Sequence, residues 1–177
     1  MCFKNSALEL KKLKTILILA LLVALNIVLD HFTIIVSDSL HITFKFLTHA
    51  ASGMLFGPVA GMLEGAVADF FGYLLYPKGP YFPGFMFSAM TTGLLFGLFF
   101  YQKKCTLPKI IGCRLLNIVL VNIVMDSLWL YVLYHNGVIA QIPARIVKSL
   151  VELPFDVVII FGMGKALERV KKARLLE

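Results

Sequence analysis

Two glycine-rich apolar segments, joined by a loop of proline, glycine and aromatic residues, constrain the fold of this chain more than any other feature. They lie between residues 57 and 97, and small residues recur at every fourth position: Gly57, Gly61 and Gly65, then Asp69, in the first, and Ala89, Gly93 and Gly97 in the second. Residues four apart share one face of a helix, and small residues on that face let two helix backbones approach closely within a bilayer. The pattern predicts close helix packing, with one acidic residue at the end of the stripe.

The composition is that of an integral membrane protein. Of the 177 residues, 59% are hydrophobic and only 15% are charged, and the mean hydropathy is +0.87. A soluble domain needs a more polar surface than this composition supplies. We therefore expect one all-α domain over residues 1–177, built as a bundle of six transmembrane helices. The expected spans run roughly over residues 15–32, 44–56, 59–76, 85–101, 109–134 and 142–167.

The first two spans depart from the usual pattern. The lysine-rich residues 1–14 before an apolar run are typical of a signal peptide. No small-residue cleavage motif follows, however, and further spans do, so we expect an uncleaved helix. The segment 44–56 is shorter than the about 20 residues that cross a bilayer as an upright helix. We expect neighbouring helices to shield it.

Lysine and arginine are distributed unevenly between the two sides of the predicted bundle. If six spans alternate, both termini and the segments near 57 and 102–109 share one side, which holds twelve of the seventeen basic residues, whereas the opposite loops hold only Lys78. Cytoplasmic loops are the ones enriched in basic residues, so we expect both termini in the cytoplasm. The net charge of +7 thus indicates topology and attraction to the lipid bilayer, and no nucleic-acid partner is expected.

Ten further charged residues lie within the expected spans or at their edges. A charge at the centre of a bilayer costs about 2.5–3.5 kcal/mol on insertion scales, so these side chains must face the interior, pair, or lie near an interface. They are Asp30, Lys45, Glu64, Asp69, Arg114, Asp126, Arg145, Lys148, Glu152 and Asp156. Several have a structural interpretation: Arg114 and Glu64 as a buried pair or a snorkelling charge, Lys45 as a snorkelling residue, and Asp156 as a partner for backbone groups freed by Pro154.

Six of these charges fall at one depth in the predicted topology. Arg145, Lys148 and Glu152 share a helix face at i, i+3 and i+7, and Lys45, Asp69 and Asp126 lie in the same outer half of the bundle. The outer loop and the fifth span add aromatic residues: Tyr81, Phe82, Phe85 and Trp129. We expect a polar, aromatic-lined cavity open to the outside, with the segment 81–85 as its lid. Trp129 and the tyrosines equally suit an aromatic belt at the membrane interface.

Catalytic and metal-binding patterns do not stand out. The sequence has no phosphate-binding loop of the G-x-x-x-x-G-K-[ST] type, and the three cysteines have neither paired nor metal-ligand spacing. The four histidines have no spacing that sets a coordination geometry. We therefore expect no catalytic residues, no metal and no cofactor. A small membrane enzyme acting on lipid head groups, the main rival class, would need a metal cluster or an activated nucleophile.

Several motifs resemble the folate-specific substrate-binding subunits (S components) of energy-coupling factor (ECF) vitamin transporters. These are the small-residue pair Ala20 and Ala24, the run G-P-V-A-G-M-L-E-G-A-V-A-D, the loop Y-F-P-G-F followed by Ser88, the pair Trp129-Leu130, and the segment P-A-R-x-x-K-x-x-x-x-L-P that contains Arg145 and Lys148. The resemblance covers residues 15–160. It departs at Asp126-Ser127, where an uncharged Asn-Thr-like pair is expected, and this leaves the role of Asp126 open.

The resemblance implies a binding subunit that captures folate outside a bacterial cell for ATP-driven uptake. The implied partners are a transmembrane coupling subunit, which Ala20 and Ala24 would face, and two cytoplasmic ATPases. Arg145 and Lys148 would receive the carboxylates of the glutamate tail or the ring oxygens, and Asp69 or Glu152 the pterin edge, while the aromatic residues enclose the rings. Riboflavin and thiamine are alternative ligands, although the basic pair disfavours cationic thiamine.

Overall fold

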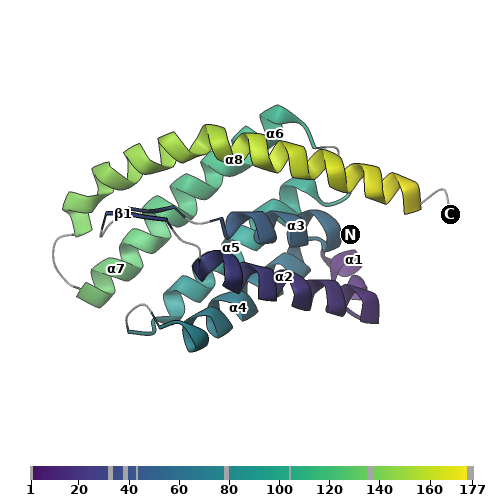
Figure 1. Cartoon of the computed structure of the whole chain (residues 1–177), viewed down its shortest axis with the longest axis horizontal. Helices are drawn as coiled ribbons and strands as arrows, with labels where there is room; N and C mark the ends of the chain where they lie inside the picture. Colours follow the sequence, from purple (N-terminus) through teal and green to yellow (C-terminus); the bar gives the residue numbers. More distant parts are fainter. Residues whose placement is uncertain are drawn as a thin grey trace.

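The chain folds into a helical bundle that includes a short β-hairpin (Figure 1). The computed structural model describes residues 2–31, 34–37, 40–42, 44–77, 80–103, 105–134 and 138–174. The elements are α1 (Cys2–Glu9), α2 (Leu13–His31), β1 (Ile34–Ser37), β2 (Leu40–Ile42), α3 (Phe46–Phe56), α4 (Pro58–Leu75), α5 (Pro83–Phe100), α6 (Leu107–Asn117), the π-helix η1 (Ile118–Met125), α7 (Asp126–Tyr134) and α8 (Val138–Arg174). The predicted all-α bundle is confirmed, but the antiparallel pairing of β1 with β2 was not predicted.

Four helices among the described residues are long and apolar enough to cross a membrane. They are α2, α4, α5 and the continuous stretch from Leu107 to Leu133, which joins α6, η1 and α7. Helix α3 is apolar but shorter. Helix α8 is longer than any of them and contains Pro143 and Pro154. Lys78, Lys104 and His135, which entered the charge and metal arguments above, lie outside the described residues.

The glycine stripe forms the contact between α4 and α5, as its spacing predicts. A Cβ atom on Gly61 would lie 2.6 Å from the carbonyl oxygen of Gly93, and one on Gly65 would lie 2.5 Å from that of Ala89. Both separations are shorter than a van der Waals contact allows, so any larger residue would force the helices apart. Asp69 lies on the same face of α4, one turn beyond Gly65.

The turn between α3 and α4 is fixed by a residue from the N-terminal helix. Gly57 adopts a φ of 93°, a conformation that is unfavourable for residues with a Cβ atom. Ser6 on α1 is fully buried beside it. Its Oγ donates to the carbonyl oxygen of Phe56 at 2.7 Å and accepts from the backbone N–H of Val59 at 3.1 Å. Helix α1 is thereby attached to the start of α4.

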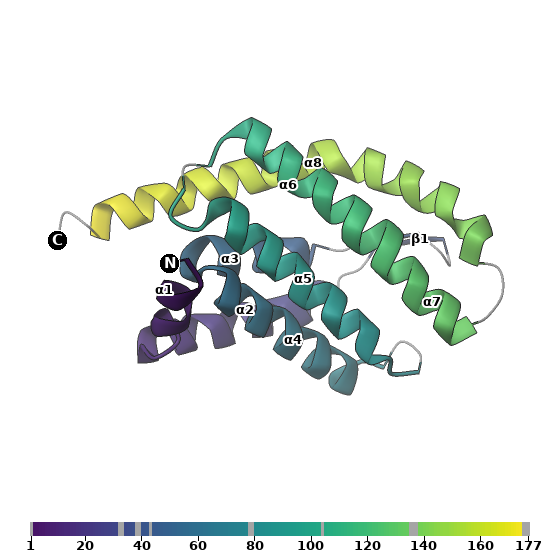
Figure 2. The same cartoon turned by 180° about the vertical axis from the view of Figure 1, so that it is seen from behind.

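Helix α1 and the C-terminal part of α8 lie at one end of the molecule, and the end of α7 and the hairpin lie at the other (Figures 1 and 2). The α3–α4 turn belongs to the first end, because it contacts Ser6. So does the connection from α5 to α6, since the backbone N–H of Cys105 donates to Glu168 Oε1 at 2.7 Å. The segments of the predicted basic side that the structure describes therefore lie together.

The apolar core lies between α3, α5, α6, η1 and α8. Its buried members are Phe46, Ala50, Met54, Leu95, Phe96, Phe100, Ile110, Cys113, Val121, Val157 and Ile160. Phe46 and Val121 also line the larger of the cavities described below. The core therefore ends where the polar interior of the bundle begins.

Candidate ligand-binding site

Two adjoining cavities occupy the interior of the bundle and the space beneath the α4–α5 loop. The inner cavity, of about 510 Å³, is lined by Asp30, Lys45, Phe46, His49, Asp69, Phe85, Ser88, Ala89, Thr92, Arg114, Asn117, Val121, Asn122, Asp126, Arg145, Lys148, Ser149 and Glu152. The loop-side cavity, of about 360 Å³, is lined by Asp30, Lys45, Asp69, Tyr73, Tyr76, Pro80, Tyr81, Phe82, Phe85, Leu130 and Leu133. Volumes of this size are typical of small-molecule sites.

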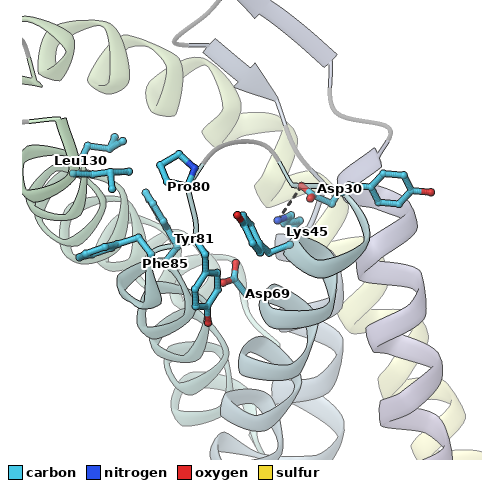
Figure 3. Close-up of a pocket in the computed structure, with 11 residues that line it drawn as sticks. Asp30, Lys45, Asp69, Pro80, Tyr81, Phe85 and Leu130 are labelled. Atoms are coloured by element: carbon cyan, nitrogen blue, oxygen red, sulfur yellow. Dashed lines mark ion pairs between the residues drawn. The ribbon is translucent and has the colours of Figure 1, made fainter.

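Every residue proposed from the sequence as a ligand contact, except Trp129, lines one or both cavities. Arg145, Lys148, Glu152 and Asp126 line the inner one, and Tyr81 and Phe82 line the loop-side one. Lys45, Asp69 and Phe85 line both, together with Asp30, and so mark the boundary between them. Figure 3 shows Leu130 of α7 on one side of the loop-side cavity and Asp30 and Lys45 on the other.

The charged face of α8 brings two cations and one acid into the inner cavity. Lys148 Nζ lies 3.7 Å from Glu152 Oε1, one helical turn away. Among the described residues, neither Arg145 Nε nor Glu152 Oε1 has a hydrogen-bond partner, although both atoms are buried. A buried polar group without a partner costs about 1–3 kcal/mol. An anionic ligand group would satisfy the Arg145 donor and recover that free energy.

Arg114, in contrast, is held by several groups. Its Nε donates to Asp156 Oδ2 at 2.7 Å, its Nη1 donates to Asn117 Oδ1 at 3.1 Å, and its guanidinium lies 4.9 Å from the ring centroid of Phe46. The predicted pairing of Arg114 with Glu64 is therefore wrong. Asp156 was expected to bind backbone groups near Pro154. In the structure its carboxylate, on α8, instead binds Arg114 on α6.

Glu64 belongs to a second buried polar cluster, which connects α2, α3 and α4. Its Oε2 lies 2.6 Å from His49 Nδ1 and accepts from Ser52 Oγ at 3.3 Å, and its Oε1 accepts from Asn26 Nδ2 at 3.4 Å. The spacing of the four histidines indicates no metal site, and no role is predicted for His49 from the sequence. No group of three or more potential metal ligands is found in the described part of the chain.

Lys45 forms an ion pair that was not predicted. Its Nζ lies 2.9 Å from Asp30 Oδ1, which joins the end of α2 to the residue before α3 (Figure 3). Asp30 is buried, whereas the Lys45 side chain remains 30% exposed. Lys45 therefore lies at the rim of the polar interior with a fixed partner. The sequence does mark Asp30 as a charged residue at the end of an apolar span, but it does not identify the partner.

Asp126 and Trp129 are connected through one hydroxyl group. Ser88 Oγ donates to Asp126 Oδ1 at 2.7 Å and accepts from Trp129 Nε1 at 3.2 Å. Asp126 follows η1, and π-helical segments are often found at functional sites because they change the direction of the side chains that follow. Trp129 itself lines neither of these two cavities, so its contact with the site is through Ser88 and through the aromatic residues of the loop.

The aromatic segment 81–85 packs against Trp129. The ring centroids of Phe82 and Trp129 are 5.7 Å apart, and those of Phe82 and Phe85 are 6.3 Å apart. Gly84 permits this arrangement, because a Cβ atom on it would lie 2.7 Å from Cδ1 of Phe82. The segment therefore forms an aromatic wall over the loop-side cavity.

The small-residue pair of the first span lies on the surface. Ala20 and Ala24 are exposed on α2, within an apolar face that includes Leu17, Leu21, Leu25 and Val28. The buried face of the same helix carries Thr15, Leu19, Asn26 and Asp30 instead. The two alanines thus form a shallow, smooth site on an otherwise bulky apolar surface.

Comparisons with known proteins agree with this architecture. The sequence model of the ECF transporter substrate-specific component matches residues 14–164. The folate transporter FolT of Clostridium novyi (strain NT) is 34% identical over 162 residues, which cover 92% of this chain and 94% of that protein. The FolT of Leuconostoc mesenteroides subsp. mesenteroides is 31% identical over 146 residues, which cover 79% and 78%.

A solved structure has the same fold. The crystal structure of FolT bound with folic acid superimposes with a TM-score of 0.82 at 34% sequence identity, and the match covers 88% of this chain and 97% of that one. A substrate-specific component is a membrane transport subunit, so the predictions of a membrane protein and of a non-enzyme are confirmed. The chain belongs to the substrate-specific components of the ECF transporters.

Proposed function

We propose that this chain is the folate-binding component of its transporter and captures the vitamin for ATP-driven uptake. The names of its relatives and the folic acid in the similar crystal structure support this ligand. The observation that carries the proposal is the buried Arg145 Nε, which has no hydrogen-bond partner in the described part of the chain and lies one turn from Lys148 in a cavity of about 510 Å³. This arrangement suits an anionic ligand with the dimensions of a vitamin.

The two chemical ends of folate match different parts of the site. The glutamate tail carries two carboxylates, and a guanidinium binds a carboxylate through two parallel hydrogen bonds. We assign the tail or the ring oxygens to Arg145 and Lys148. The pterin ring presents an N–H edge that suits a carboxylate, for which Asp69 and Glu152 are the candidates.

The aromatic wall would enclose the rings of the ligand. Phe85 borders both cavities, Tyr81 and Phe82 border the loop-side one, and planar rings gain from stacking on such side chains. Trp129 would act by supporting Phe82, and Asp126 by holding Ser88 in place. Lys45, which is bound to Asp30, would contribute positive charge at the boundary of the cavities.

Folate titration tests this function directly. Trp129 is the single tryptophan of the chain and adjoins the aromatic wall, so its fluorescence should change when folate binds to the purified protein in detergent. We expect saturable binding of folate, and no competition by riboflavin or thiamine at equal concentration. Tight binding of either competitor, or mass-spectrometric detection of another compound that co-purifies with the protein, would refute the assignment.

We further propose that α2 docks onto a transmembrane coupling subunit that works with two cytoplasmic ATPases. Support comes from the exposed Ala20 and Ala24, because small residues on an apolar helix let a partner helix approach closely. The double variant Ala20→Leu/Ala24→Leu should bind folate normally but fail to co-purify with the coupling subunit. Retention of the complex would contradict this docking site.

The topology belongs to the same proposal. We infer that residues 1–177 form one domain in the bacterial cell membrane with both termini in the cytoplasm, which is supported by the basic residues gathered at one end of the bundle. Alkaline phosphatase fused after the C-terminus should be inactive, and green fluorescent protein at the same place should be fluorescent. The opposite pair of results would reverse the orientation.

A further inference from the structure

The inner cavity is bordered by a histidine that is not among the ligand contacts discussed so far. His49 lies on α3, is 5% exposed, and lines the cavity close to the ion pair of Lys45. Its Nδ1 lies 2.6 Å from Oε2 of Glu64, which is 1% exposed. The ring is therefore held through one nitrogen, and Nε2 is the nitrogen available to a ligand.

The surroundings of Glu64 limit how protons are distributed in this pair. Its other hydrogen-bond partners are the neutral side chains of Asn26 and Ser52. A fully buried carboxylate without a compensating positive charge is strongly disfavoured. A neutral imidazole beside an ionised carboxylate has a net charge of −1. We therefore expect the His49–Glu64 pair to hold one more proton than this, so that its net charge is zero.

A neutral pair has two possible arrangements, and both give the same result at Nε2. In the first, an ionised Glu64 accepts from the Nδ1–H of an imidazolium, whose Nε2 also carries a hydrogen. In the second, a protonated Glu64 donates to Nδ1 of a neutral ring, whose single hydrogen must then be on Nε2. Only a pair with net negative charge would leave Nε2 unprotonated.

We propose that His49 is a ligand-contacting residue that donates a hydrogen bond from Nε2 to an acceptor atom of folate, a carbonyl or carboxylate oxygen or a ring nitrogen. This inference rests on the proposed function, because it takes the inner cavity to be the folate site. It adds a donor from α3, on a different helix from Arg145 and Lys148 of α8. The ligand would then be held from both walls of the cavity.

Two substitutions separate ligand contact from structural support. In His49→Asn the side-chain amide falls near the position of Nδ1, so the bond to Glu64 is kept and the Nε2 donor is lost. In His49→Gln the amide reaches toward the position of Nε2, so the donor is kept and the bond to Glu64 is lost. We expect the Kd for folate to rise about tenfold to a hundredfold in His49→Asn, the range for a lost hydrogen bond in a buried site. His49→Gln should lose less affinity but more thermal stability.

A matched control and a spectroscopic measurement complete the test. Ser6→Ala removes a buried hydroxyl at the far end of the bundle, so it should lower the Tm and leave the Kd unchanged. In ligand-free protein with ¹⁵N-labelled histidine, the resonances absent from His49→Asn identify His49, and two-bond ¹H–¹⁵N spectra should show a protonated Nε2.

The outcomes distinguish this inference from the proposed function. An unchanged Kd in His49→Asn, a larger affinity loss in His49→Gln than in His49→Asn, or an unprotonated Nε2 in the free protein would overturn the role of His49. Failure of the wild-type protein to bind folate would instead overturn the proposed function, and the protonation measurement would still stand.

Discussion

Two arginines line the same cavity and differ in almost every other respect. Arg114 uses its guanidinium on Asp156 and Asn117 and lies over the ring of Phe46. Arg145 has a buried Nε without a hydrogen-bond partner among the described residues. One arginine thus connects α6 to α8 and is part of the scaffold. The other has a buried donor, its Nε, that no described residue uses.

This difference has energetic consequences that separate stability from binding. Removing one partner of a buried ion pair leaves the other charge uncompensated and is strongly destabilising. Removing a buried donor that has no partner relieves a penalty in the free protein, but it removes an attraction for an anionic ligand. Stability should therefore depend on Arg114, and affinity on Arg145. The following three predictions test this comparison, beginning with the largest expected effect.

Replacing Arg114 should have the largest effect on stability. We expect Arg114→Ala to lower the free energy of unfolding in detergent micelles by about 3–5 kcal/mol, because Asp156 remains buried without its counter-charge. The double variant Arg114→Met/Asp156→Leu removes both charges and should recover most of this loss. If the single variant unfolds within about 1 kcal/mol of the wild type, the scaffold role assigned to Arg114 is wrong.

Replacing Arg145 should weaken folate binding and leave the fold almost unchanged. We expect the Kd of Arg145→Ala to rise about tenfold to a hundredfold, since a charge-assisted hydrogen bond contributes about 1.5–3 kcal/mol. Arg145→Lys keeps the charge but not the paired geometry, so its Kd should be intermediate. An unchanged affinity in Arg145→Ala, measured by the Trp129 fluorescence titration, would remove Arg145 from the site.

Ser88 offers the smallest and most local test. Its hydroxyl is hydrogen-bonded to both Asp126 and Trp129, so one neutral group holds the acid and the indole together. Ser88→Ala should cost about 1 kcal/mol in folate affinity, by freeing both side chains. It should also shift the Trp129 emission of the free protein, because the indole N–H loses its acceptor. Thr91→Ala, at a half-buried position on the same helix whose hydroxyl donates to the carbonyl oxygen of Phe87, is the control and should do neither.

The features that could be predicted from the sequence are those that depend on local periodicity. The four-residue spacing from Gly57 to Gly65 predicts one helix face, and the structure uses that face for the α4–α5 contact. Likewise, Arg145, Lys148 and Glu152 share a helix face by spacing alone and all line the inner cavity. Their role in folate binding remains a prediction.

Partner choice and local backbone geometry came only with the tertiary structure. Arg114 pairs with an acid 42 positions away, and His49 with one 15 positions away, and no periodicity relates either pair. The β1–β2 hairpin and the π-helical turns of η1 likewise lie in segments whose apolar residues fit more than one backbone conformation.

The sequence by itself determined that the chain is a helical membrane bundle with charges directed inward, because hydrocarbon excludes the alternatives. Only the packing of the helices decided which of those charges compensate one another and which remain available to a ligand. The physical reason is that an ion pair depends on a separation of a few ångströms in space, whereas helix periodicity orders residues only along a single helix.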